Sequence, residues 1–210
     1  AASTWSTRRL AALQQEHRSL QARSGRFEVR DPNRVWVAAV PHDLNNEHRR
    51  VWRWLVYLPA NYNFHRVYVS GIISADSPRR VNHGSGKSWS SPSPEPKYCA
   101  ITATLHRRDE NDNWELDLVH DNGSGRLNFA LTNVDDLMVE TLGDNGPVGI
   151  DIDQPFCLLR MREPVASAPS KHPQVGNEPV YRGVYYYCVP QARITAFEKS
   201  QEFPPPPSGN

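Results

Sequence analysis

Short runs in which apolar and polar residues alternate are the feature that most constrains the fold of this chain of 210 residues. The runs begin near Phe27 and are rich in Val, Ile, Tyr and Trp, which favour β-strands. Turn residues separate them: Asp112-Asn113 and Asp121-Asn122-Gly123 are hairpin signals, because Asn and Gly tolerate a positive φ. No helical pattern intervenes. The sequence therefore predicts a mainly β protein, an antiparallel sandwich or jelly roll rather than an α/β enzyme.

The expected strands share this two-residue period. We place them at residues 27–30, 35–40, 51–58, 66–74, 98–107, 114–120, 126–132, 156–162 and 180–189, with a short further candidate at 193–197. Residues 135–142 are the one place in this body where a helical turn is expected. On the strand at 51–58, Trp52 and Trp54 share a face with Val56 and Leu58, and we expect that face to be core.

A different period precedes the strands. Leu10, Leu13, His17 and Leu20 recur at spacings of three and four, which predicts a helix over residues 5–23 with one narrow apolar seam. We expect three parts: residues 1–25 as a stalk or docking arm, 26–198 as the β-sandwich domain and 199–210 as a Pro-rich extended tail. An amphipathic arm folded onto the body is the alternative.

Charge is concentrated at this end of the chain. The first 30 residues hold six Arg and two Glu, a net charge of +4, whereas the whole chain carries +1. Arg8 and Arg9 are therefore candidate contacts for an acidic protein partner or an anionic membrane surface, unless the face is simply solvated. The small overall charge provides no general field for nucleic acid, which we do not expect as a partner.

Two long insertions, residues 76–97 and 164–179, interrupt the strands. Trp89 lies in the first, and Tyr185 and Tyr187 share a face of a late strand. These three rings are candidate binding residues for a glycan or a protein partner. The alternatives are that Trp89 plugs its own loop and that the tyrosines face the second sheet.

The sequence contains no strong catalytic or metal-binding pattern. Gly86-Lys87-Ser88 lacks the first Gly of a phosphate loop, and the eight His have no recognised zinc spacing. Asp151 and Asp153 alternate and are a weak candidate for gripping a cation, with exposed carboxylates as the alternative. We therefore expect no catalytic residue, metal or cofactor.

Three cysteines, Cys99, Cys157 and Cys188, lie far apart in apolar runs. Buried, unreactive thiols are expected, and a Cys157–Cys188 bridge is the alternative. No run approaches the roughly 18 apolar residues of a membrane-spanning helix, so we expect the chain as given to be soluble.

The segments at residues 51–59 and 107–116 carry a resemblance to a known group. The first reads Trp-Arg-Trp-x-x-Tyr-Leu-Pro from Trp52 to Pro59. Over residues 8–120 the chain resembles uncharacterised bacterial proteins that have a single-span N-terminal anchor, a leucine-spaced juxtamembrane helix and a β-rich domain. The resemblance implies an anchored domain facing the cell envelope, outside the cytoplasm, and carries no known activity. Arg8 and Arg9 do not fit it well, because positive charge after an anchor disfavours export.

Our leading hypothesis from the sequence is a non-catalytic interaction or structural subunit, displayed by the N-terminal helix at a membrane or within an assembly. A carbohydrate-binding module that uses exposed aromatic residues is the first alternative. A metal- or carboxylate-dependent hydrolase is the second.

Overall fold

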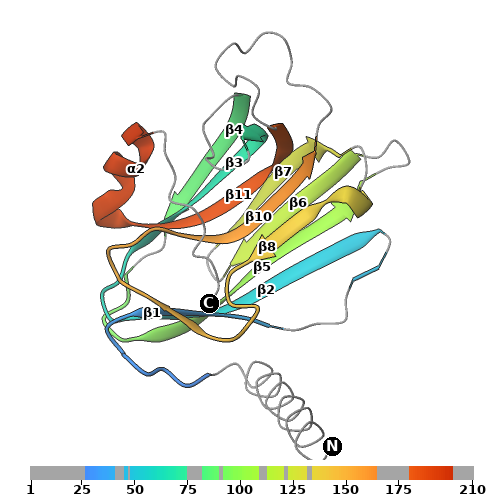
Figure 1. The fold of residues 1–210 in the computed structure, drawn as a ribbon. Coiled ribbons are helices and arrows are strands. Elements are labelled where there is room, and N and C mark those ends of the chain that lie inside the picture. Colours follow the sequence, from blue (N-terminus) through green and yellow to red (C-terminus); the bar gives the residue numbers. More distant parts are fainter. Residues whose placement is uncertain are drawn as a thin grey trace, which may run out of the picture.

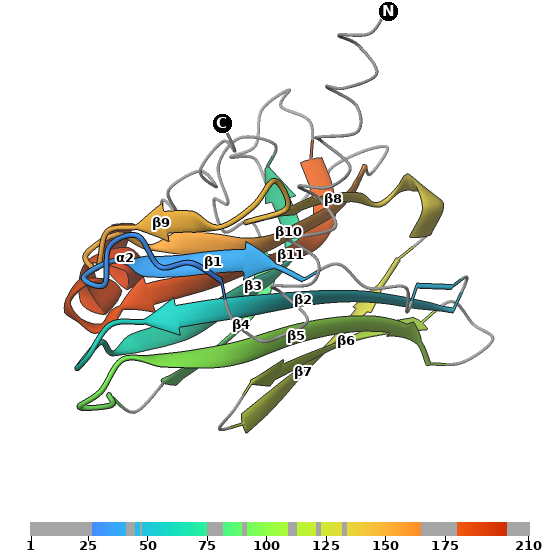
Figure 2. The ribbon, with the colours of Figure 1, turned by 90° about the horizontal axis from the view of Figure 1, so that it is seen from below.

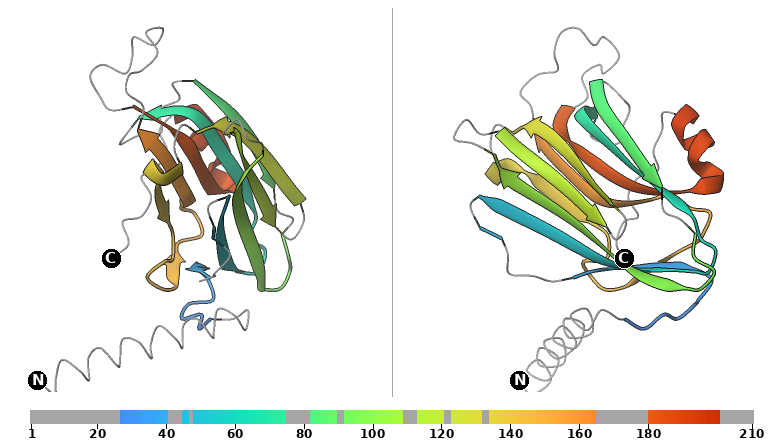
Figure 3. Two further views of the ribbon diagram at one scale, coloured as in Figure 1. Left: turned by 90° about the vertical axis from the view of Figure 1, so that its right-hand side faces the viewer. Right: turned by 180° about the vertical axis from the view of Figure 1, so that it is seen from behind.

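The computed structural model describes residues 27–40, 45–46, 48–74, 82–89, 92–108, 113–120, 123–131, 134–164 and 180–200. They form two antiparallel sheets that lie in two layers (Figures 1 and 3). Helix is confined, in the described part, to two short 3₁₀ turns and one short α-helix near its end. The prediction of a mainly β, antiparallel fold is confirmed.

The first sheet has six strands and the second has five. In spatial order the first sheet consists of β7 (Gly123–Ala130), β6 (Asn113–His120), β5 (Lys97–Arg107), β2 (Arg49–Leu58), β1 (Val35–Ala39) and β9 (Val148–Ile150). The second consists of β4 (Asn82–Trp89), β3 (Phe64–Ser74), β11 (Val180–Pro190), β10 (Phe156–Pro164) and β8 (Met138–Thr141). Figure 2 shows the first sheet in this order.

The main core lies between the two layers, and the alternation on β2 explains which side chains enter it. Trp54 and Val56 are fully buried there, and Trp52 packs against the same cluster while remaining partly exposed. The second sheet contributes Met161 and Tyr186 to this cluster. The prediction that the Trp-bearing face of this strand is core is therefore confirmed.

Apolar side chains also occupy the outer face of each sheet. On the second sheet, Tyr185 and Tyr187 form a cluster with Ile194 and Phe197 of α2 (Ile194–Ser200), which lies on the side of this sheet away from β1 and β2 (Figure 1). On the first sheet, Phe27 joins a cluster of buried residues that includes Trp36, Ala38, Leu55 and Tyr57. Both faces of several strands are consequently apolar.

Several boundaries differ from the sequence prediction. Residues 27–30 are not a strand, and 193–197 fall in a 3₁₀ turn (η2, Gln191–Arg193) followed by α2. Pro190 ends β11, and Ile194 and Phe197, three residues apart, are buried on one side of the helix. Within 135–142 only a short turn (η1, Val134–Asp136) is helical, and β8 follows it.

Besides β8, two other strands were not predicted. β4 lies inside the long insertion expected at 76–97, and its sequence, NHGSGKSW, has no apolar alternation to reveal it. It pairs with β3 through the backbone over eight positions. β9 has only three residues, too few for a period to show.

The turn after β8 joins the edges of the two sheets. The Leu142 amide donates to the Leu158 carbonyl of the second sheet at 3.1 Å, and the Ala39 amide of the first sheet donates to the Gly143 carbonyl at 3.2 Å. Gly143 has a φ of +87°, and a Cβ there would lie 2.8 Å from the Ala39 nitrogen. Only glycine meets both requirements without strain.

We expect Gly143→Ala to lower the free energy of unfolding by about 2 kcal/mol or more, because the side chain meets backbone and the left-handed conformation is itself costly. Gly125→Ala is the matched control, since no atom of the described residues lies within 4 Å of a Cβ at that position. Urea denaturation of the two variants measures both effects. Equal stabilities would contradict the role assigned to the turn.

Candidate ligand-binding cavity

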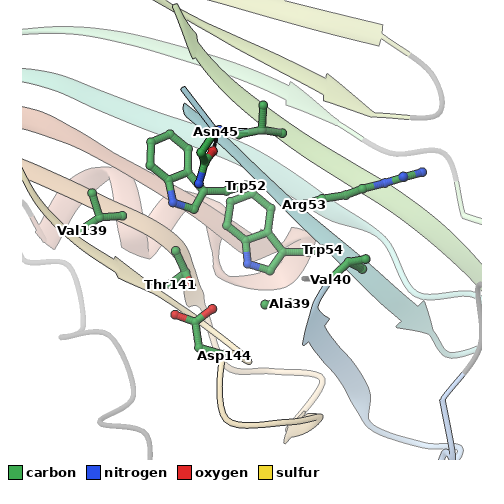
Figure 4. A pocket seen from close by; sticks show the side chains of 10 residues that line it. Ala39, Val40, Asn45, Trp52, Arg53, Trp54, Val139, Thr141 and Asp144 are labelled. Atoms are coloured by element: carbon green, nitrogen blue, oxygen red, sulfur yellow. Dashed lines mark hydrogen bonds between the residues drawn. The ribbon is translucent and has the colours of Figure 1, made fainter. Parts of the chain in front are cut away.

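A cavity of about 370 Å³ lies at the edge of the two-sheet body, between β1 and β2 on one side and β8 with its following turn on the other (Figure 4). Its walls come from segments far apart in the sequence. The lining residues are Ala39, Val40, Asn45, Val51, Trp52, Arg53, Trp54, Val139, Thr141 and Asp144.

Strand β2 supplies the two indole rings. Trp52 and Trp54 are two residues apart, so they point to the same side of the sheet, and Figure 4 shows their rings next to each other. Trp54 is fully buried and its Nε1 donates to the Leu142 carbonyl at 3.1 Å. Trp52 is only partly buried, so its ring is the one that a ligand can reach. The Arg53 side chain points away from the two rings (Figure 4).

Polar groups stand around these rings. Asn45 Oδ1 accepts a hydrogen bond from the Val51 amide at 2.8 Å, which orients the side chain and leaves its NH₂ group as a donor. Thr141 lies on β8, and Asp144 lies exposed in the turn that follows; both face the indoles in Figure 4. The cavity thus offers a donor, a hydroxyl and a carboxylate beside an aromatic face.

The described lining holds few groups of the kind used in acid–base chemistry. Among the lining residues, all within the described part of the chain, Asp144 is the single carboxylate and there is neither His nor Cys. Glycosidase chemistry requires two carboxyl groups across the scissile bond. A ligand with one apolar face and several hydroxyl groups would match the indole and the polar groups around it.

The predicted aromatic binding residues lie elsewhere. Tyr185 and Tyr187 are fully buried and stack on each other at 6.0 Å between ring centroids. Phe197 of α2 lies edge-on to Tyr187 at 5.5 Å, so the helix covers this face. Binding of a ligand by Tyr185 and Tyr187 required exposed rings, and the structure shows that both rings are covered. Trp89 is the last residue of β4, and its backbone pairs with that of His65 on β3. The structure does not describe its side chain, so its predicted binding role stays a prediction.

Other predicted sites have simpler outcomes. The proposed docking residues Leu10, Leu13, Leu20, Arg8 and Arg9 lie outside the described residues. Asp151 and Asp153 are exposed and bind separate arginines, at 2.9 Å from Arg34 and 3.5 Å from Arg193 respectively.

Within the described ranges, no group of three or more His, Cys, Asp or Glu is placed to hold a metal ion. In the same ranges no helix is long and apolar enough to cross a membrane.

Sequence reasoning missed the polar half of the cavity. Asn45, Thr141 and Asp144 belong to three separate segments, and no spacing relates them to Trp52. The sequence does contain one signal for Trp52. It lies nearer than Trp54 to the two arginines that begin the strand, and side chains near a polar strand end are more exposed than those in its middle.

Comparison with known proteins adds no assignment. No protein-family model, curated protein or solved structure matches the chain.

None of the three cysteines forms a disulfide bond and all three are buried, as expected, so the alternative bridge between Cys157 and Cys188 is not formed. Burial raises the pKa of Cys157 to about 12 and that of Cys188 well above its usual value. A raised pKa in the folded state means that the unfolded chain loses these protons first as pH rises.

We therefore expect stability to fall as pH rises from about 9 to 12, by up to about 1.4 kcal/mol per pH unit for the Cys157 thiol. Urea denaturation across this range measures the slope, and Cys157→Ala should reduce it. At pH 8, iodoacetamide should modify the three thiols only after the protein is unfolded in guanidinium. Fast labelling of the native protein would contradict the burial.

Proposed function

We propose that this protein is a non-catalytic binding protein, a β-sandwich whose edge cavity takes a carbohydrate. The observation that supports this most directly is the partly exposed Trp52 ring, fixed beside Asn45, Thr141 and Asp144. Sugars present flat C–H faces that pack on indoles and hydroxyl groups that bond to amides and carboxylates. The residues differ from the aromatic set predicted from the sequence, but the class of ligand is the same.

The size and rigidity of the cavity are consistent with a small saccharide. Its volume of about 370 Å³ falls at the lower end of the range for small-molecule sites. Trp54 is held by its bond to the Leu142 carbonyl and Asn45 by its bond to the Val51 amide, so two walls are ordered before a ligand arrives. Preformed walls reduce the entropy lost on binding.

The test is isothermal titration of the protein with neutral cello-, chito- and malto-oligosaccharides. We expect one series to bind, Asp144→Asn to weaken it about tenfold, and Trp52→Ala to abolish it. Asp144 is exposed, so its isosteric variant separates lost binding from lost stability. Ile152→Ala is the control, an exposed apolar residue outside the cavity lining. The proposal would be contradicted if the wild-type protein bound none of these oligosaccharides, or if neither Asp144→Asn nor Trp52→Ala changed the affinity.

A second candidate is the docking role of residues 1–25, which would display the domain at a membrane or in an assembly. The narrow seam of Leu10, Leu13 and Leu20 supports it, as does the positive charge that includes Arg8 and Arg9. The body provides a fixed attachment point: Tyr98 donates from its hydroxyl to the Phe27 carbonyl at 2.9 Å, and the two rings pack edge to face at 5.4 Å. An anchored, envelope-facing location belongs to this same proposal.

Sedimentation of the full chain tests the docking role. A seam that packs on another helix predicts association that Leu13→Asp abolishes, because a carboxylate would be buried in the apolar contact. Gln15→Asp adds the same charge off the seam and should leave association intact. A chain that is monomeric throughout, whether or not Leu13 is replaced, would contradict it.

A further inference from the structure

A second group of polar side chains lies on the opposite face of β8 from the cavity. Arg160 and Arg162 are alternate residues of β10 and therefore share a face. Both side chains are nearly buried, at 13 % and 16 % exposed. Their NH2 atoms meet the same oxygen, Oε1 of Glu140 on β8, at 2.5 and 2.9 Å. Two guanidinium groups thus share one carboxylate oxygen.

A buried hydroxyl group lies beside these arginines. Tyr185 is paired directly with Arg160 across β10 and β11, and its ring is fully buried against Tyr187. Among the described residues, the Tyr185 hydroxyl has no hydrogen-bond partner, and neither has Nε of Arg160. Burial raises the pKa of the Tyr185 hydroxyl, and the positive charges of Arg160 and Arg162 act in the opposite direction. Buried donors left without acceptors are uncommon and costly.

The carboxylate is the most exposed charged group of this cluster. Glu140 is 43 % exposed and belongs to β8, an edge strand of four residues. The arginines come from β10, which has a neighbour on both sides, and the ring of Tyr181 packs against the Arg162 guanidinium at 5.0 Å. Rotation of Glu140 into solvent would release the NH2 atoms of Arg160 and Arg162 from the oxygen that they share.

We propose that Arg160, Arg162 and Tyr185 form a binding site for a phosphate group, and that Glu140 occupies this site when no ligand is present. A phosphate dianion carries twice the charge of a carboxylate such as Glu140, so it interacts more strongly with a pair of guanidinium groups. Phosphate also has more acceptor oxygens, one of which can accept a hydrogen bond from the Tyr185 hydroxyl. The near burial of the arginines favours a small soluble phosphate or phosphomonoester over a flat lipid surface.

Calorimetric titration with inorganic phosphate, in low-salt buffer at pH 7.5, tests this site. We expect wild-type binding to be weak and Glu140→Gln to tighten it about tenfold, because the competing charge is gone while the side-chain shape is kept. Arg160→Lys should remove binding, since the guanidinium fork is lost. Tyr185→Phe keeps the ring and should weaken binding by about tenfold.

Controls separate this site from general electrostatics and from the cavity. Asp153→Asn releases Arg193 from an exposed ion pair at 3.5 Å and should leave phosphate affinity unchanged. Trp52→Ala should leave it unchanged as well, so this proposal and the carbohydrate proposal can fail separately. Glycerol phosphate should bind like inorganic phosphate, and acetate should bind more weakly.

Three outcomes would overturn the proposal. The first is a Glu140→Gln variant that binds no tighter than wild type. The second is an equal gain from Asp153→Asn. The third is binding only to vesicles that contain phosphatidic acid, with none to the soluble phosphates.

Discussion

The turn that follows β8 is the constraint on which the edge of this molecule depends. Through Leu142 it bonds to Leu158 in the second sheet, and through Gly143 to Ala39 in the first. The Leu142 carbonyl also accepts from the buried indole of Trp54. Two packed sheets are otherwise held together by side-chain contacts between the layers, which are adaptable. Here directed backbone bonds set the spacing of the two sheets at one place, and the cavity lies beside it.

The chemistry of β8 follows from its position as an edge strand. Alternation turns Val139 and Thr141 toward the cavity and Glu140 toward the arginines on the outer face. A strand with one neighbour leaves side chains on both faces within reach of solvent. The two proposed sites are therefore back to back on a strand of four residues, although each is built from different partners and is tested by different ligands.

How far the sequence predicts this molecule depends on the range of the interaction involved. Alternation is local, so the buried face of β2 with Trp54 could be predicted, as could the antiparallel class. β4 could not, because its strand state comes from pairing with β3 and not from its own polar residues. The sequence around Tyr185 and Tyr187 alternates in the same way whether their face is exposed or covered. The face is buried because Phe197 of α2 packs against this cluster. The cavity brings Trp52 together with residues from other segments of the chain, and no local sequence pattern indicates that these residues are neighbours.

Native-state hydrogen exchange at two amides tests the central claim most directly. The claim is that the turn fixes both sheets, so the Ala39 and Leu142 amides, which donate to Gly143 and Leu158, should open only when the whole body unfolds. We predict exchange free energies at these amides equal to the global value from denaturation. Rapid exchange there, with the amides in the middle of β2 still protected, would show that the edge opens alone and that the cavity has no fixed shape.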